Sequence, residues 1–216
     1  MPIRSWEEYC ERESVSRETL LALQVYHRLL RDWSSTLNLV APKTLDDVWI
    51  RHFADSLQLR KFIADATTVV DLGSGAGFPG LVLAVAAIGA GVTFHLVESD
   101  QRKCAFLRAV VLETGANVKI YPARIEHVIS ELPTAGAVTA RALKSLDELV
   151  KLSAPLIDAG ALGVFPKGRD YADELTLAQA RSNYSFACSE SLTSQDSRIV
   201  IVRSFNVRVS STGKVE

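Results

Sequence analysis

Apolar residues recur at two different periods along this chain of 216 residues, and the change of period divides it into two parts. Up to residue 64, apolar side chains stand three and four residues apart, as they do on one face of an α-helix. Beyond it, short β-branched runs alternate with segments of helical spacing, which is typical of a mostly parallel sheet covered by helices. We therefore predict a helical extension over residues 1–64, an α/β core over 65–209 and a polar tail over 210–216.

Serine caps mark the first two helices of the extension. Ser5 has a glutamate three residues on, the spacing of a capping box, and begins a short helix that ends before Ser14. Ser16 begins a longer helix, whose buried stripe is predicted to contain Leu20, Leu23, Leu30, Trp33 and Leu37. A helix with such a stripe must pack on a larger body, so the extension is expected to lie against the core.

A third helix is expected after a turn over residues 38–43, beginning at Thr44 and continuing through residue 57. On this helix His52 and Asp55 would share one side. Arg51 and Asp55 are four residues apart, which is the spacing of a helical ion pair. From spacing alone, these residues are interpreted as a surface ion pair and a half-buried histidine.

The core is predicted to hold a seven-stranded, doubly wound and mostly parallel sheet of the Rossmann-like kind. The expected strands cover residues 68–72, 92–97, 118–121, 137–140, 160–165, 185–188 and 199–207. The expected helices cover residues 79–88, 100–115, 125–128, 145–156 and 170–180. Gly115 is a predicted C-cap, Ser145 with Glu148 is a second capping box, and the last two strands form an antiparallel pair.

The first of these strands runs into a glycine-rich turn, Asp-Leu-Gly-Ser-Gly-Ala-Gly-Phe-Pro-Gly over residues 71–80. Glycines suit a turn that needs positive φ or lets a ligand approach closely. Counted from Gly75, the turn satisfies the dinucleotide pattern G-x-G-x-x-G. Counted from Asp71, it is the Asp-x-Gly-x-Gly-x-Gly loop of methyltransferases that bind S-adenosylmethionine. We favour the second frame, because the dinucleotide frame starts two residues late relative to the strand.

Glu98 ends the second predicted strand, at the edge of the sheet where such folds bind ligands. A carboxylate there can accept hydrogen bonds from both ribose hydroxyls of an adenosine, which either frame requires. A hydride-transfer enzyme also needs a substrate region with an acid or base. The sheet takes up almost all of the remaining length, so a small transferase fits this chain better.

Composition limits the other possibilities. The net charge of -1 and the pI near 6.4 do not indicate a strongly basic nucleic-acid binder, so any basic patch must be local. Three widely spaced cysteines, Cys10, Cys104 and Cys188, suggest neither a disulfide framework nor a zinc site, and no metal is expected. Neither a signal peptide nor a membrane-spanning apolar run is found, so we expect a cytoplasmic protein.

Six motifs follow one another in an order that resembles one enzyme family. They are Arg-His-Phe-Ala-Asp-Ser-Leu at 51–57, the glycine turn at 71–80, Val-Glu-Ser at 97–99 followed by Arg102-Lys103, Ala-Arg-Ile-Glu at 123–126, Ala-Arg-Ala at 140–142 and Pro-Lys-Gly at 166–168. This order is similar to that of the bacterial small-subunit ribosomal RNA guanine-N7 methyltransferases, of the RsmG or GidB type. The resemblance covers nearly the whole chain, extension included.

The resemblance implies a class I fold that binds S-adenosylmethionine and leaves S-adenosylhomocysteine as product. It implies methyl transfer to N7 of one guanine in the 530 loop of 16S ribosomal RNA, either as RNA or in the small subunit. Apart from the resemblance, we expect the protein to be a monomer. Glu98 stands where the family often has aspartate. The last strand, ending in Val202-Arg203-Ser204, lacks a lysine that the family often has.

The turn and the resemblance together give three sets of candidate residues. The predicted cofactor contacts are Asp71, Gly73, Gly75, Gly77, Phe78, Glu98, Ile125, Glu126 and Arg141. The predicted RNA contacts are Arg51, Arg124, Lys144, Lys167 and Arg169, and the residues expected to line the site are His52, Asp55, Arg124, Arg141 and Lys167. No residue is assigned to proton transfer, because N7 of neutral guanine already carries an available lone pair.

Two alternatives stay open at this point. One is an S-adenosylmethionine-dependent enzyme that methylates a small molecule or a protein. The other is a catalytically silent module that binds RNA or a nucleotide.

Overall fold

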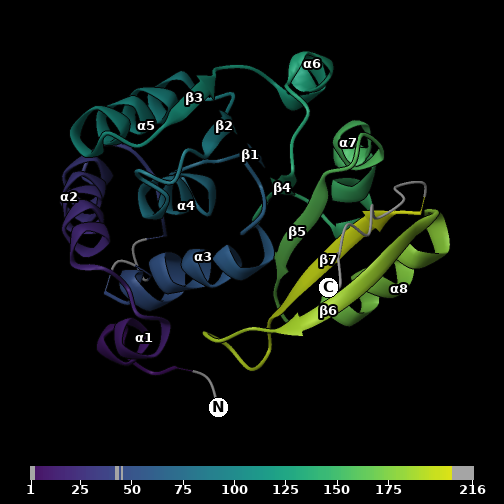
Figure 1. The fold of residues 1–216 in the computed structure, drawn as a ribbon, viewed down its shortest axis with the longest axis horizontal. Helices are drawn as coiled ribbons and strands as arrows, with labels where there is room; N and C mark the ends of the chain where they lie inside the picture. Colours follow the sequence, from purple (N-terminus) through teal and green to yellow (C-terminus); the bar gives the residue numbers. More distant parts are fainter. Residues whose placement is uncertain (1–2, 42–43, 45, 206–216) are drawn as a thin grey trace, which may run out of the picture.

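The computed structural model of the chain describes all residues except 1–2, 42–43, 45 and 206–216. The predicted polar tail lies outside the described residues, as do parts of the turn over 38–43 and of the last predicted strand. The described residues form a seven-stranded sheet with helices on both faces (Figure 1). The predicted α/β, doubly wound fold is thereby confirmed.

The strands are β1 (Thr68–Leu72), β2 (Thr93–Val97), β3 (Val118–Tyr121), β4 (Ala137–Thr139), β5 (Leu162–Lys167), β6 (Tyr184–Glu190) and β7 (Arg198–Ser204). Their order across the sheet is β3-β2-β1-β4-β5-β7-β6. β7 runs antiparallel to β5 and β6, whereas the other neighbours are parallel. The order reverses between β1 and β4, and sheets of this kind bind ligands at such a reversal, outside the carboxyl ends of the strands.

Alternate residues of β1 face two different hydrophobic clusters, because successive side chains of a strand point to opposite faces. Val69 lies in the cluster under α4 and α5, whereas Val70 lies in the cluster under α6, α7 and α8. These helices are α4 (Gly80–Ala86), α5 (Gln101–Thr114), α6 (Ile125–Val128), α7 (Leu146–Asp158) and α8 (Tyr171–Arg181), with a 3₁₀ turn at Ile129–Glu131. Burial on both sides explains why the central strands are continuous apolar runs.

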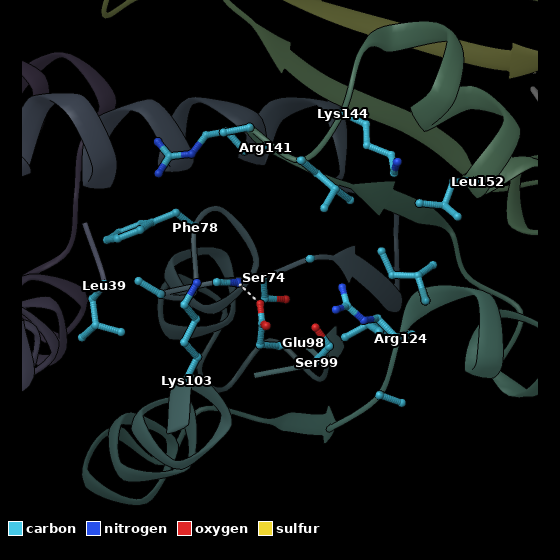
Figure 2. A pocket seen from close by; sticks show the side chains of 18 of the residues that line it. Leu39, Ser74, Phe78, Glu98, Ser99, Lys103, Arg124, Arg141, Lys144 and Leu152 are labelled. Carbon is cyan, nitrogen blue, oxygen red and sulfur yellow. Dashed lines mark hydrogen bonds between the residues drawn. The ribbon is translucent and has the colours of Figure 1, made fainter. Parts of the chain in front are cut away.

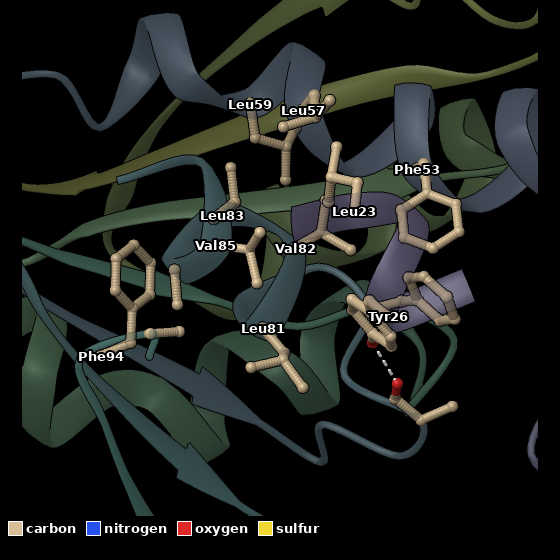
Figure 3. Close-up of a cluster of buried hydrophobic side chains, with 14 of the residues drawn as sticks. Leu23, Tyr26, Phe53, Leu57, Leu59, Leu81, Val82, Leu83, Val85 and Phe94 are labelled. Carbon is tan, nitrogen blue, oxygen red and sulfur yellow. Dashed lines mark hydrogen bonds between the residues drawn. The ribbon is translucent and has the colours of Figure 1, made fainter. Parts of the chain in front are cut away.

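The N-terminal helices α1 (Trp6–Glu13) and α2 (Arg17–Ser34) pack on the face of the sheet that carries α4 and α5 (Figure 1). Leu23, Tyr26 and Leu30 of α2 are fully buried in one cluster with Leu81 of α4 (Figure 3). Extension and core therefore share a continuous apolar contact. The division at residue 64 stays an interpretation of the sequence.

The predicted third helix has a different hydrogen-bonding pattern from the expected one. A π-helix spans Trp49–Ala54, a single α-helical turn spans Asp55–Leu57, and a 3₁₀-helix spans Gln58–Phe62. The predicted ion pair between Arg51 and Asp55 is wrong, because Asp55 pairs with Arg141 of the distant β4 end instead. Spacing within one helix could not reveal that tertiary partner.

Most of the predicted caps are confirmed. The hydroxyls of Ser5 and Ser16 accept bonds from backbone N–H groups of the first turns, and Gly115 ends α5 in the left-handed region. Ser145 is the N-cap residue of α7, as predicted, but its hydroxyl does not accept the expected bond from a backbone N–H and donates instead to the carboxylates of Asp147 and Glu148. The N–H of the first residue of α7 is bound instead by a carboxylate of α8, a partner far away in the sequence.

Candidate functional site

A cavity of about 490 Å³ opens at the carboxyl ends of β1, β2 and β4, where the strand order reverses (Figure 2). Its walls come from the glycine turn after β1, the segment after β2, the start of α6 and the loop after β4. The extension contributes Leu39, Val40 and His52. The cavity is therefore built by both parts of the chain.

Three glycines of the turn require the left-handed region, with φ of +68° at Gly73, +58° at Gly75 and +93° at Gly77. Gly73 and Gly75 line the cavity. Gly77 does not; a Cβ there would collide with the Tyr26 hydroxyl and lie 2.7 Å from the Cβ of Leu81. The turn thus has one side facing the cavity and one side packed against the extension and α4.

Asp71 lies behind the turn and is fully buried. Its Oδ1 accepts a hydrogen bond from the Thr139 hydroxyl at 2.8 Å, and its Oδ2 accepts one from the Gly80 N–H at 3.2 Å. The structure therefore places this predicted cofactor contact outside the cavity lining, where it joins β1 to β4 and to the start of α4. Burial raises the pKa of Asp71 to about 6, although the hydrogen bonds to its carboxylate oppose the shift.

The raised pKa of Asp71 predicts a pH effect on stability. Between pH 4 and about 6 the folded protein holds a proton that the unfolded chain has released, so the free energy of unfolding falls as pH rises through this window. The fall attributable to Asp71 is about 3 kcal/mol for a shift from 3.8 to about 6. Urea unfolding from pH 4 to 7 is expected to show this fall in the wild type relative to Asp71→Asn. Parallel curves for the two proteins would contradict it.

Glu98 is buried at the end of β2 and lines the cavity. Its Oε2 accepts a hydrogen bond from the Gly75 N–H at 2.8 Å (Figure 2). Its Oε1 accepts one from the Asp100 N–H, also at 2.8 Å. Each carboxylate oxygen has a second lone pair. The side chain can therefore hold the turn in shape and still has lone pairs for the two hydroxyls of a ribose. The ribose contact itself remains a prediction.

Replacing Glu98 by glutamine is expected to lower both cofactor affinity and stability. An amide has one acceptor oxygen, so its NH₂ group would face one of the two backbone N–H donors and leave it unsatisfied. We expect a loss of about 1–3 kcal/mol in cofactor binding by calorimetry, together with a lower melting temperature. Unchanged affinity would remove the ribose contact from Glu98.

Arg141 follows β4 and joins the core to the extension at the rim of the cavity. Its Nη1 donates to the carbonyl of Arg51 and to Oδ2 of Asp55, both at 3.1 Å, and its Nη2 donates to Nδ1 of His52 at 2.8 Å. Its guanidinium also lies 5.1 Å from the centre of the Phe78 ring. One side chain thus positions both the helix that carries His52 and the aromatic wall of the cavity.

His52 is held as a neutral imidazole. Burial, followed by the charges of Arg141 and Arg51, lowers the pKa of His52 to about 3. Because Nδ1 accepts from Arg141, we place the proton on Nε2, which lies 3.0 Å from the hydroxyl of Thr44. The ring stacks on Phe78 with centroids 4.8 Å apart. His52 therefore lines the cavity as a neutral ring that stays uncharged near neutral pH.

The predicted cationic residues are divided between two places. Arg124 and Lys144 line the main cavity, as does Lys103, which belongs to one of the six motifs but was not among the predicted contacts (Figure 2). Lys167 and Arg169 line a second cavity beside it. Arg51 is exposed and lines neither of these two cavities; its carbonyl accepts from Arg141.

Lys167 is committed to contacts within the protein. Its Nζ pairs with the Glu174 carboxylate at 2.6 Å and donates to the carbonyl of Lys144 at 2.9 Å, and only 10% of the side chain is exposed. An RNA contact by Lys167 would have to replace a buried ion pair. The structure supports a brace between β5, α8 and the loop after β4, and the predicted RNA contact remains a prediction.

Three more of the predicted cofactor contacts are found at the main cavity. Phe78, Ile125 and Glu126 line it, with Ile125 buried at the start of α6 and Glu126 exposed beside it. Asp55 is not in this lining but lies on the wall of the second cavity.

Tyr26 of α2 is a site residue that the sequence analysis missed. It is fully buried, stacks on Phe78 with centroids 5.7 Å apart, and donates its hydroxyl to the carbonyl of Ala76 in the glycine turn (Figure 3). Burial raises its pKa, so the hydroxyl keeps its proton. The signal was present, since Tyr26 stands three residues after Leu23 and four before Leu30 in the predicted stripe. Leu39 and Val40 carried no such signal.

Replacing Tyr26 by phenylalanine is expected to weaken cofactor binding more than it weakens the fold. The ring stays packed, but a buried carbonyl of the turn loses its donor, which costs about 1–3 kcal/mol. The cofactor dissociation constant is expected to rise, with a smaller change in the melting temperature of the cofactor-free protein. The matched control is Tyr9→Phe, because Tyr9 is also buried but lies in α1, away from the turn. Equal effects of the two substitutions on cofactor binding would contradict the role of Tyr26.

Neither a metal site nor a membrane span is found in the described part of the chain. Its histidine, cysteine, aspartate and glutamate side chains form no group of three or more that could hold a metal ion. Cys10, Cys104 and Cys188 are free thiols. None of the described helices is long and apolar enough to cross a membrane.

Comparison with known proteins agrees with this geometry. The GidB family model, described as rRNA small subunit methyltransferase G, matches residues 19–200. Ribosomal RNA small subunit methyltransferase G of Rhodospirillum centenum is 51% identical over 177 residues, covering 82% of this chain and 79% of its own. The protein of the same name from Methylorubrum populi is 47% identical over 194 residues, covering 89% of this chain and 92% of its own.

The solved structures add support for the fold. A putative O-methyltransferase from Klebsiella pneumoniae superimposes with a TM-score of 0.56 at 10% identity, over 88% of this chain and 90% of its own. At that identity the likeness concerns the fold alone, whereas the family model and the close relatives cover most of the sequence. The chain therefore belongs to the family of ribosomal RNA small subunit methyltransferase G.

Proposed function

We propose that this protein transfers a methyl group from S-adenosylmethionine to N7 of one guanine in the 530 loop of 16S ribosomal RNA. The observation that carries the proposal is the cavity at the strand ends, where the left-handed Gly73 and Gly75 stand beside the buried carboxylate of Glu98. Family membership supports a ribosomal RNA methyltransferase, and the earlier resemblance supplies the choice of guanine.

The residues present fit S-adenosylmethionine. A cavity of about 490 Å³ is within the usual range for small-molecule sites, about 300–1,000 Å³. Glu98 has lone pairs for the ribose, the glycines leave room for close approach, and Ile125 offers an apolar surface at the far side. When bound there, S-adenosylmethionine would supply an electrophilic methyl group on a positively charged sulfur.

The chain's own residues are suited to positioning rather than to proton transfer. N7 attacks with a lone pair that the neutral base already has, so the reaction needs no general base. His52 is neutral and both of its ring nitrogens are engaged, which agrees with that requirement. Catalysis would come mainly from alignment, which can lower the barrier by about 7–11 kcal/mol. Arg141 and Phe78 would provide that alignment at the rim.

Local cations would hold the RNA. Arg124 and Lys144 are exposed at the main cavity, Arg169 is exposed at the second cavity, and Arg51 is exposed on the helix that carries His52. These cations are present although the whole chain has a net charge of -1. Such residues can pair with phosphates or stack on unpaired bases. We infer that the substrate is 16S RNA or the small subunit, and that the protein acts in the cytoplasm as a monomer.

A transfer assay with methyl-labelled S-adenosylmethionine tests the proposal. Purified protein would be incubated with small subunits from cells lacking the modification and, separately, with total cell extract. We expect label in 16S RNA, at a position where chemical cleavage specific for N7-methylguanine maps to the 530 loop. Label in protein or small-molecule fractions, with none in 16S RNA, would favour the first alternative. Tight RNA binding without transfer would favour the silent module.

A further inference from the structure

A second, smaller cavity of about 230 Å³ lies next to the main one, and Arg141 and Ala142 line both. Its other walls come from the segment that ends β5, the start of α8, the residues at the start of β7, Ser191, and Asp55 and Gln58 of the extension. Because the two cavities share these residues of the loop after β4, a ligand in one cavity would lie beside a ligand in the other.

No contact among the described residues requires residue 168, on the wall of the second cavity, to be a glycine. Its φ is not in the left-handed region, and a Cβ built on it would meet no atom within 4 Å. The other described glycines divide into those with left-handed φ and those, Gly80, Gly136 and Gly163, whose Cβ would press on neighbours. Since neither backbone nor packing requires glycine at 168, we attribute it to close approach of a ligand.

The charged groups of the second cavity are suited to a nucleotide. Arg198 lies 5.2 Å from the Tyr171 ring centre, and its Nη1 donates to the carbonyls of Gln195 and Ser197 at 2.8 Å. Among the described contacts, its Nη2 and Nε donors remain available. Arg169 lines this cavity with a side chain that is 83% exposed, and its one ion pair with a described residue is a 3.5 Å contact to Asp196.

The carboxylates of the second cavity differ in whether they are paired with a cation. Asp55 is paired with Arg141, and Glu174 is paired with Lys167. Asp170 has no ion-pair partner among the described residues. A free carboxylate can accept hydrogen bonds from the N1–H and N2–H₂ donors of guanine, while arginine side chains can bind the phosphate of the guanosine nucleotide.

We propose that the second cavity seats the acceptor guanosine nucleotide, with the base against Gly168 and its phosphate at Arg169 and Arg198. This inference rests on the proposed function. A cavity of this size admits a base only when it is unstacked from its neighbours, as in a single-stranded loop. In the reaction the N7 lone pair forms the new N–C bond while the carbon–sulfur bond breaks toward sulfur. The positive charge passes to the base, and no proton leaves.

Filling the second cavity tests the proposal. At Gly168 φ lies outside the left-handed region and a new Cβ meets no atom within 4 Å, so Gly168→Leu is expected to fold. Ser197→Leu adds bulk at another lining residue should the first variant fold poorly. The matched control is Ala172→Leu, an exposed residue in the first turn of α8 outside the cavity lining. For each protein we would measure melting temperature, S-adenosylmethionine affinity by calorimetry, and kcat/KM for 16S RNA at saturating cofactor.

We expect the cavity-filling variants to keep the melting temperature and cofactor affinity of the wild type while kcat/KM for RNA falls by at least about tenfold, with Ala172→Leu unchanged. Wild-type values of kcat/KM in Gly168→Leu and Ser197→Leu would overturn the inference, as would a loss confined to cofactor affinity. Failure of the proposed function would be seen separately, because the wild-type protein itself would then transfer no label to RNA.

Discussion

Arg141→Ala is expected to reduce methyl transfer by about 100-fold or more while leaving the protein folded. The substitution removes the hydrogen bonds to the Arg51 carbonyl, to Asp55 and to His52. It also removes the guanidinium that lies over the Phe78 ring. The rim of the cavity then loses the group that fixes its geometry, whereas the sheet and its two hydrophobic clusters are untouched. Turnover measured with labelled cofactor, beside circular dichroism and melting curves, would show the effect.

Arg141→Lys is the matched control for the shape of the guanidinium. Lysine keeps the charge and can pair with Asp55, but it cannot present two separate nitrogens to Asp55 and His52 in fixed planar geometry. We expect intermediate activity. Normal turnover in Arg141→Ala would remove the residue from the site, and equal loss in both variants would assign its role to geometry rather than charge.

Two glycine-to-alanine changes in the same turn are expected to affect different properties, stability in one case and cofactor affinity in the other. In Gly80→Ala the new Cβ would lie 2.5 Å from the Cβ of Asp71 and 2.6 Å from Cδ2 of Leu96, both buried, so we expect a loss of stability of about 3 kcal/mol or more. In Gly75→Ala the Cβ has open space on the cavity side, with its nearest contact 3.9 Å away, and the left-handed backbone costs only about 1–2 kcal/mol.

The cavity side of Gly75 decides the second result. A methyl group there would occupy space that the cofactor needs, so affinity measured by calorimetry is expected to fall by at least about tenfold. Gly80→Ala, where it folds, is expected to bind with a smaller change. The reverse pattern, with Gly75→Ala binding normally, would contradict the seat that we assign to the cofactor.

The periodicity of the sequence was sufficient to predict the sheet and its helices. Each predicted strand overlaps an observed one. Because parallel strands end at the same edge of a sheet, the predicted strands already implied that Glu98 and Arg141 lie at one edge. Apolar runs and helix caps depend on residues close together in the sequence, so they can be predicted without knowledge of the fold. The strongest motif, the glycine turn, also lies where it was expected.

The orientation of side chains within that motif could not be predicted from spacing. Asp71 and Gly77 belong to the loop pattern, yet neither faces the cavity. Asp71 accepts hydrogen bonds from β4 and from the start of α4, and Gly77 packs against Tyr26. Asp55 pairs with Arg141 and not with Arg51 for a similar reason. Each outcome depends on a residue far away in the sequence, which local periodicity does not contain.

The 16S ribosomal RNA of a strain lacking this gene tests the central claim most directly. Mass analysis and reverse transcription across the 530 loop would be compared among the wild type, the deletion strain, and the deletion strain carrying either the wild-type gene or Arg141→Ala. We expect one N7-methylguanine to disappear on deletion, to return with the wild-type gene and to stay absent or strongly reduced with Arg141→Ala. An unchanged N7-methylguanine in the deletion strain would contradict the proposed function.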